Sequence, residues 1–268
     1  MTLASTPNGK PASGEERVAG TQTIGRALAI LGLLREAKGG LALTEVSRSL
    51  SLHLSTTHRI LRALVNAGYV TQNAEERYRL GREAYLLGQA AQRELGFDNV
   101  MPLLEDVAHR TGESANLVVR DGNEAVVVLR VESTQPLRFT QPTGTRIPLH
   151  CTSTGKALLA FGPDPAKEVE ALGELERFTP DTITSRRDLL SDLEAARRRG
   201  YSTNLGERIT GVCGVAAPVL GHGGELIAAV AIQGPDIRMP ADGLEELGRL
   251  VVDIANQVTH LIPGGYRL

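Results

Sequence analysis

The first third of the chain alternates apolar and polar positions at helical spacing. Residues 1–20 are rich in Ser, Gly and Pro, show no periodicity and are expected to form a flexible tail. A helix is predicted from Thr23 to the Gly39-Gly40 pair, because its apolar residues fall near i, i+4 and i+7. Those residues are Ile24, Leu28, Ile30, Leu31 and Leu34.

Two further helices and a hairpin complete this part of the chain. Thr44 can cap a short second helix, and a third helix is predicted from Ser55 to Gly68. Strand-like residues 69–72 and 77–80 flank a turn, which is the pattern of a β-hairpin. Three helices and a hairpin in this order predict a winged helix-turn-helix domain over residues 21–82.

The remaining pattern predicts a second domain over residues 97–268, joined to the first by a linker helix over residues 83–96. Short turns connect several of its strands, which favours a mainly antiparallel sheet with helices packed against it, an α/β (α+β) fold. Helices are predicted over 99–111, Thr154–Phe161, Arg186–Arg199 and Ala241–Leu261, and strands over Asn116–Arg120, Ala125–Val131, Leu137–Gln141, Gly211–Leu220 and Leu226–Gln233.

Charge separates the same two parts. The whole chain carries 29 basic and 31 acidic residues, a formal charge of −2. Residues 21–82 hold nine basic and four acidic residues and are therefore +5, the tail is neutral, and residues 83–268 are −7. A basic module beside an acidic body indicates one part that faces nucleic acid and one that does something else.

The third predicted helix has two distinct faces. Ile60, Leu61 and Leu64 fall on one arc, and Arg59 and Arg62 fall on the opposite arc. A recognition helix needs this division, because one side packs on its own domain while the other offers donors to base edges and phosphates in the major groove. The residues expected to contact double-stranded DNA are Thr44, Ser55, Thr56, Thr57, His58, Arg59, Arg62, Arg77 and Arg79, the last two on the wing.

Composition excludes several other classes of protein. Two cysteines are too few for a secreted disulfide scaffold or for a zinc site with three cysteine ligands. No apolar stretch approaches the ~18–20 residues that span a bilayer, and residues 1–20 lack the apolar core of a signal peptide. Aromatic residues make up 3% of the chain, which disfavours recognition of single-stranded nucleic acid by stacking. A cytoplasmic protein without a membrane partner is expected.

Three groups of motifs follow one another along the chain. Residues 43–80 contain STTHRILRALVNAGYV, and residues 149–160 read LHCTSTGKALLA. Gly200-Tyr201, Glu207 and Gly211 then precede the runs VAAPV and AIQGP. In order and spacing these motifs resemble the winged helix, the GKA-LLA motif and the C-terminal signature of the IclR family of bacterial transcriptional regulators. The resemblance covers roughly residues 21–262.

The resemblance implies a two-domain regulator. An N-terminal winged helix would bind operator DNA, and a C-terminal GAF-like effector-binding domain would bind a small organic metabolite. Family members generally form homodimers through the DNA-binding domains and often homotetramers through the effector domains, so a palindromic operator is expected. The expected function is that of a sequence-specific transcriptional regulator, a repressor or an activator, whose operator affinity or activity responds to the effector. The alternative is a metabolic enzyme with an appended winged helix.

The family's effector contacts, carried over by motif, fall on Ser153, Thr154, Asn204, Val212, Gly214, Ala231 and Gln233. Asn204 stands where oxo-acid binders often have an acid, and Gly214 and Ala231 replace polar residues that hold a small carboxylate. A pocket with fewer donors favours a larger or more apolar ligand. We therefore expect an aromatic or other medium-sized organic acid or an amino-acid-like metabolite, while ordinary core packing remains the alternative for these positions.

Enzyme chemistry finds little support in the motifs. Gly155-Lys156 does not complete a phosphate-binding loop, because His150 stands at the first glycine of that motif and Ala157 at its Ser/Thr. Ser153 and Thr154 are instead expected to begin a helix whose free amides line a cavity. The residues leave a Cys/His nucleophilic pair open, although no motif typical of cysteine enzymes surrounds either cysteine. We predict no catalytic residue, metal site or cofactor.

Overall fold

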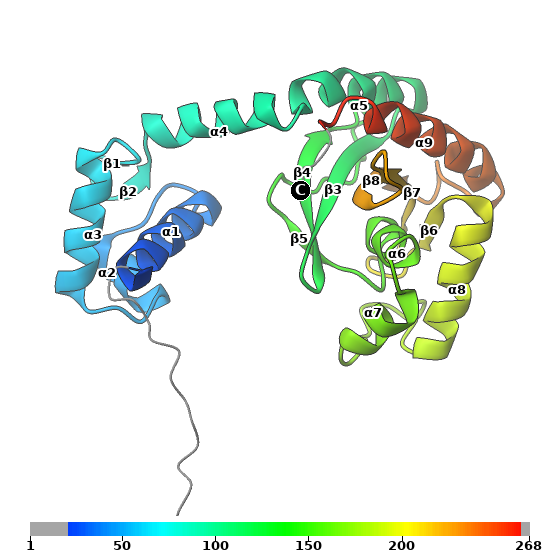
Figure 1. Ribbon diagram of the computed structural model, residues 1–268, viewed down its shortest axis with the longest axis horizontal. Coiled ribbons are helices and arrows are strands. Elements are labelled where there is room, and N and C mark those ends of the chain that lie inside the picture. Colours follow the sequence, from blue (N-terminus) through cyan, green and yellow to red (C-terminus); the bar gives the residue numbers. More distant parts are fainter. Residues whose placement is uncertain (1–20, 264–268) are drawn as a thin grey trace, which may run out of the picture. The chain divides into compact units, whose positions relative to one another are not determined.

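The computed structural model describes residues 21–263 (Figure 1). The chain divides into two compact units, with the boundary between Ala91 and Gln92. The predicted tail over residues 1–20 lies outside the described residues. None of the described helices is long and apolar enough to cross a membrane.

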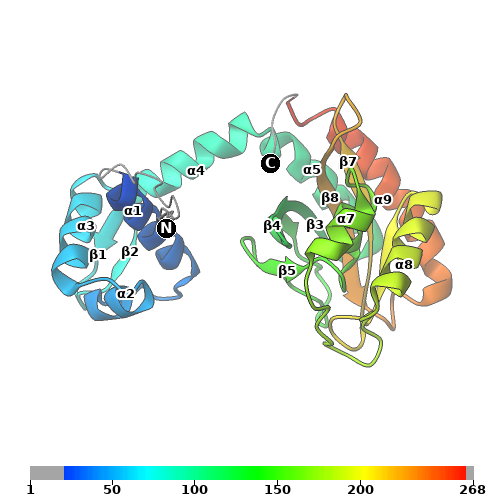
Figure 2. The ribbon, with the colours of Figure 1, turned by 60° about the horizontal axis from the view of Figure 1, so that its bottom comes forward.

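The N-terminal unit is a winged helix-turn-helix, as predicted. Three helices, α1 (Thr21–Glu36), α2 (Leu43–Ser49) and α3 (Leu54–Asn66), precede the antiparallel hairpin of β1 (Val70–Gln72) and β2 (Tyr78–Leu80) (Figure 2). Side chains from all three helices and both strands share one apolar core, which fixes α3 against the rest of the unit. The fully or nearly fully buried members are Ile30, Leu34, Val46, Ile60, Leu61, Val70 and Tyr78.

One local prediction about this unit is wrong, and part of one apolar face is exposed. Thr44 does not cap α2, because the helix begins at Leu43 and the cap is Ala42, whose N–H donates to Glu45 Oε2 at 2.7 Å. Ile24 and Leu28 belong to the apolar spacing of α1, yet their side chains are 62% and 63% exposed. Helical periodicity identifies an apolar face but does not say what covers it.

Helix α4 (Arg82–Glu94) follows the hairpin and contains the boundary between the units. None of its residues is buried. The predicted linker helix over residues 83–96 therefore begins one residue earlier and ends two residues earlier. Tyr85, Leu86 and Leu87 are exposed along it. This helix therefore carries an apolar surface that the described residues leave exposed.

The C-terminal unit is built on a six-stranded sheet in which every neighbouring pair is antiparallel. The strand order is β5-β4-β3-β8-β7-β6, so β3 and β8 lie at the centre. The predicted mainly antiparallel α/β (α+β) fold is confirmed. The strands are β3 (Ser114–Asp121), β4 (Glu124–Val131), β5 (Arg146–Pro148), β6 (Ser202–Leu205), β7 (Val212–Leu220) and β8 (Leu226–Pro235).

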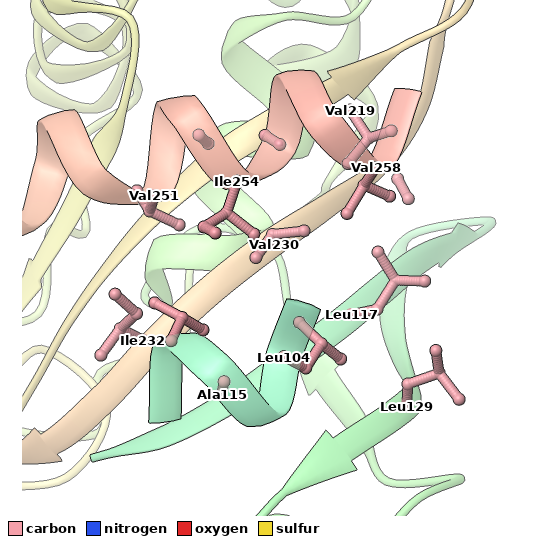
Figure 3. Close-up of a cluster of buried hydrophobic side chains, with 14 of the residues drawn as sticks. Leu104, Ala115, Leu117, Leu129, Val219, Val230, Ile232, Val251, Ile254 and Val258 are labelled. Carbon is pink, nitrogen blue, oxygen red and sulfur yellow. The ribbon is translucent and has the colours of Figure 1, made fainter. Parts of the chain in front are cut away.

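Helices cover both faces of this sheet. On one face α5 (Phe97–Thr111) and α9 (Leu244–Thr259) pack against side chains such as Leu117, Val230 and Ile232 (Figure 3). On the other face α6 (Ser153–Ala160) packs against β7 and β8, with α7 (Pro165–Ala171) and α8 (Arg186–Arg199) beside it. Strand residues alternate between the two cores, because successive side chains point to opposite faces. A short 3₁₀ turn, η1 (Ala241–Gly243), precedes α9.

Four segments of this unit differ from prediction. Leu137–Gln141, predicted as a strand, has no regular structure. Strands β5 and β6 and helix α7 were also not predicted, because three, four and seven residues are too few for a periodic signal. Helix α7 nevertheless has a readable start, since Asp164 caps it through Lys167 N and Pro165 occupies its first turn.

Candidate functional site

Helix α3 presents a basic face away from its core. Ile60 and Leu61 are buried, whereas Ser55, Arg59 and Arg62 are exposed. Arg59 and Arg62 lie three residues apart and therefore on the same side of the helix. Among the described residues neither guanidinium has a hydrogen bond or an ion pair. Both are therefore free to contact phosphates or guanine acceptors.

The start of α3 adds a second feature suited to DNA. His53 precedes the helix without a side-chain capping bond, so the N–H groups of the first turn, at Ser55 and Thr56, have no side-chain acceptor. Free N–H groups and the helix dipole favour a phosphate at such a terminus. His58 is exposed one turn further along, so the exposed face runs from the first turn of the helix through Arg62.

Two residues expected to contact DNA are directed elsewhere. Thr57 is fully buried, and its hydroxyl donates to His53 O at 3.1 Å. Its position toward the core follows from the 100° step of the helix, which places it with Ile60 and Leu61. Arg77 donates to Gly40 O at 2.8 Å and to Glu45 Oε2 at 3.0 Å, so it anchors the wing to α2.

The two remaining predicted DNA contacts outside α3, Arg79 and Thr44, are exposed. Arg79 donates from Nε to Gly39 O at 3.1 Å, yet its side chain remains exposed on the wing. Thr44 is exposed within α2. The basic face used below is therefore defined by Ser55, His58, Arg59, Arg62 and Arg79, and it stays a predicted DNA contact.

A second candidate site lies on the sheet face that α6 covers. Antiparallel pairing places Asn204 opposite Gly214, Gly214 opposite Gln233, and Gln233 opposite Ser114. Residues paired across a ladder point to the same face, so these four form one row across β6, β7, β8 and β3.

A parallel row lies two residues along the same strands. It runs through Ser202, Ala216, Ala231 and Asn116. The motif-based positions of β6, β7 and β8 thus come together, including Ala231, which packs within the core beneath α6. Long-range pairing brings together residues that are more than one hundred positions apart in sequence.

Helix α6 closes this face from above. Its cap is Thr152, whose Oγ1 accepts from Gly155 N at 3.0 Å. Gly155 is required by close approach, since an added Cβ would lie 2.3 Å from Leu149 O. An added Cβ at Gly214 would lie 2.9 Å from Ser153 Oγ, so the start of α6 sits directly against β7 beneath it. Ser153 and Thr154 do begin a helix, as predicted.

A small cavity lies beside these residues. Its lining combines polar and apolar side chains and consists of Phe139, Gln141, Thr152, Asn204, Arg208, Ile209, Val212 and Gln233. Its volume is about 10 Å³, which leaves room for one water molecule. Among the described residues, two buried atoms of this lining have no hydrogen-bond partner, Gln141 Oε1 and Gln233 Oε1, and neither do Asn116 Oδ1, Ser153 Oγ and Thr154 Oγ1 on the same side of the sheet. A buried polar atom needs a partner, which either a water or a ligand can supply.

Comparison with known proteins identifies both units. Residues 23–74 match the IclR helix-turn-helix domain, and residues 94–260 match the bacterial transcriptional regulator IclR C-terminal domain. This chain belongs to the IclR family. The expectation of a transcriptional regulator rather than an enzyme is thereby confirmed.

Individual relatives agree with this assignment. The HTH-type transcriptional repressor AllR of Salmonella typhimurium is 33% identical over 259 residues, which is 94% of each chain. A solved transcriptional regulator from Rhodococcus sp. RHA1 is 30% identical, with a TM-score of 0.78 over 90% of this chain and 98% of that one. An IclR homologue from Microbacterium hydrocarbonoxydans, solved with 4-hydroxybenzoate, is 25% identical, with a TM-score of 0.79 over 89% and 99% of the two chains.

The lysine of the GKA motif has a role in this IclR-family chain that sequence reasoning missed. Lys156 is 1% exposed, and its Nζ lies 2.8 Å from Asp192 Oδ2 and 2.6 Å from Glu207 Oε1. It therefore ties α6 to α8 and to the segment after β6. Burial raises the pKa of the Glu207 carboxyl, and the charge of Lys156 opposes that rise. A buried lysine requires an acidic partner, but sequence alone does not say which of 31 acids supplies it.

The histidine and cysteine before α6 are packed rather than exposed. His150 Nε2 lies 2.9 Å from Glu176 O. Burial raises the pKa of the Cys151 thiol to about 12, so the thiolate is suppressed at neutral pH. Within residues 21–263 no group of three or more His, Cys, Asp or Glu side chains is placed to hold a metal ion.

Proposed function

We propose that this IclR-family regulator binds a palindromic operator through α3 and represses transcription until a small organic acid occupies the cavity beneath α6. The observation that carries the proposal is that Arg59 and Arg62 of α3 are exposed and form no ion pair with any described residue. The name of the Salmonella relative supports the repressor role. The domain limits that go with this function are a DNA-binding domain over residues 21–82, a linker helix over 83–96 and an effector domain from residue 97, in a cytoplasmic protein.

The basic face of α3 is tested by binding to the promoter region of the protein's own gene. Replacing Arg59 by Ala removes one guanidinium from the groove and should weaken operator binding by about 1–3 kcal/mol. Arg35→Ala is the control, because Arg35 is exposed and pairs with Glu36 at the end of α1. Equal gel shifts for wild type and Arg59→Ala would show that the reading face is assigned wrongly.

The effector part of the proposal is supported by the cavity and by a relative. The cavity combines unpartnered polar atoms with Phe139, Ile209 and Val212. The Microbacterium homologue was solved with an aromatic hydroxy acid, which supports an aromatic or other medium-sized organic acid here. Since the present cavity has room for one water, such an acid must open it. Opening is what allows ligand binding to favour one of two conformations.

The oligomeric part of the proposal is a homodimer, or a homotetramer built from it. Exposed apolar side chains on α1 and α4 supply the surface, namely Ile24, Leu28, Tyr85, Leu86 and Leu87. Exposed apolar patches mark protein interfaces, and a second copy of the chain is the occupant that gives two reading helices for a palindrome.

A further inference from the structure

Arg208 is a cation of the cavity that no motif singled out. It follows β6, lines the cavity with Asn204 and Gln233, and is half-buried. Among the described residues its guanidinium takes part in no hydrogen bond or ion pair, whereas Arg120, Arg146 and Arg238 of the same unit all pair with acids. An arginine beside a cavity without an acidic partner is a docking point for an anion.

The electrostatic surroundings of Arg208 leave its charge uncompensated. Burial lowers the pKa of the guanidinium, and the Cys151 thiol is the group whose charge would raise it. That thiol is itself neutral, because burial raises its pKa to about 12. A ligand anion would therefore supply the missing negative charge, and it would do so where water competes less than at the surface.

The chain fixes the residue that precedes Arg208. Glu207 N donates to Asn204 Oδ1 at 2.9 Å, and the carbonyl of Glu207 accepts from Thr182 Oγ1 at 2.6 Å. Its carboxylate accepts from Lys156 Nζ at 2.6 Å. Strand β6, the loop at Thr182 and helix α6 thus all hold this turn, so the backbone that carries the Arg208 side chain is preorganised.

A wider, mainly apolar hollow shares two lining residues with the cavity. Phe139 and Val212 line both spaces, and Leu137 and Ile237 line the outer one, which has a volume of about 270 Å³. Arg138 and Asp236 also border it. The inner space is small and has both polar and apolar side chains in its lining, whereas the outer space is larger and mainly apolar. Together they fit a ligand with one charged end and an apolar body.

We propose that Arg208 binds the carboxylate of the effector and that the apolar body of the same acid extends past Phe139 into the outer hollow. This inference rests on the proposed effector function and assigns it a specificity-determining residue. It selects monocarboxylic acids with an aromatic or aliphatic body over their neutral amides. It also selects them over inorganic phosphate, which has no body to fill the hollow.

The test compares matched acids and amides on the full-length protein by isothermal titration calorimetry. The probes are benzoate with benzamide, 4-hydroxybenzoate with its amide, hexanoate with hexanamide, and inorganic phosphate. Wild type should bind at least one acid, with its amide at least tenfold weaker and phosphate weaker still. Arg208→Gln should lose at least tenfold in affinity for that acid, and Arg208→Lys should lose less. Arg187→Gln, an exposed arginine on α8, should bind as wild type does.

The outcomes separate this inference from the regulator function. An acid that binds Arg208→Gln as tightly as wild type, an amide that matches its acid, or binding of none of the three acids overturns the role of Arg208. Operator binding without ligand should be equal for wild type and Arg187→Gln, and circular dichroism spectra and unfolding midpoints that match wild type show that both variants fold. Absence of operator binding by wild type would contradict the regulator function instead.

Discussion

At the scale of single residues, Lys156 has a role that its motif does not reveal. The residues around it exclude a phosphate-binding loop but do not say what the lysine contacts, and its side chain lies between Asp192 and Glu207 with 1% exposure. Removing one member of such a buried group leaves the other charges without compensation, which costs far more than the net value of the pairs. The lysine of this motif is therefore best understood as a structural member of the effector domain.

Lys156→Met should lower the free energy of unfolding by about 3–5 kcal/mol at neutral pH, since the buried Glu207 carboxylate and the partly buried Asp192 carboxylate lose their cation. Urea denaturation followed by circular dichroism measures this. Lys167→Met is the matched control, because Lys167 is exposed and its pair with Asp164 lies at the surface. A loss below about 1 kcal/mol, the range of surface pairs, would show that the three charges are not coupled as described.

Glu207→Gln should change how stability depends on pH. The pKa of Glu207 is raised in the folded chain by burial, so its contribution is fully present below the unfolded pKa and is lost as pH rises through the folded pKa. Wild type should therefore lose free energy of unfolding from mildly acidic to neutral pH, and Glu207→Gln should lose less. The variant keeps an oxygen for Lys156 Nζ and leaves that lysine with Asp192 alone. Parallel pH profiles would refute the assignment.

At the scale of elements, sequence alone predicts those with local signals. Helix α8 was predicted with its observed limits, Arg186–Arg199, because Ser185 caps it and Gly200 ends it with a positive φ of 88°. The segment Leu137–Gln141 was misassigned, since alternation there serves a loop whose Phe139 and Gln141 line the cavity.

For the cavity too, the sequence predicts some of the residues but not those placed by loops. Its motif-derived residues come together through strand register, whereas Arg208 and Phe139 depend on loop packing, which has no periodic signature. Of the positions taken from the resemblance, Asn204, Val212 and Gln233 line the cavity, and the other lining residues became visible only with the fold.

The exposed apolar face of α1 gives an element-scale prediction. Leu28→Glu should convert a dimer to a monomer, because it places a charge at the proposed contact between two copies. The free energy of unfolding of the N-terminal unit should change little, since Leu28 is already 63% exposed. Sedimentation velocity measures the mass, with Ser49→Glu on exposed α2 as the control of equal charge. An unchanged mass for Leu28→Glu would place the dimer contact elsewhere.

At the scale of the whole molecule, regulation requires a coupling free energy between ligand binding in the effector cavity and operator binding by α3. Helix α4 is the segment that crosses the boundary between the two units, and we expect it to carry the coupling. An acid that weakens operator binding by a given factor must itself bind the operator complex more weakly by the same factor. Both factors should become one when α4 is interrupted.

Gly88 allows that interruption without loss of packing. It lies within α4, and a Cβ added there meets nothing within 4 Å. Gly88→Pro removes a helical N–H and breaks or kinks the helix, whereas Gly88→Ala strengthens it. We expect Gly88→Pro to bind the tightest acid with unchanged affinity, while the ratio of operator affinities with and without that acid falls toward one. Gly88→Ala should keep the wild-type ratio or enlarge it. Fluorescence anisotropy with labelled operator measures the ratio, and a full response in Gly88→Pro would mean that the coupling takes a route other than a continuous α4.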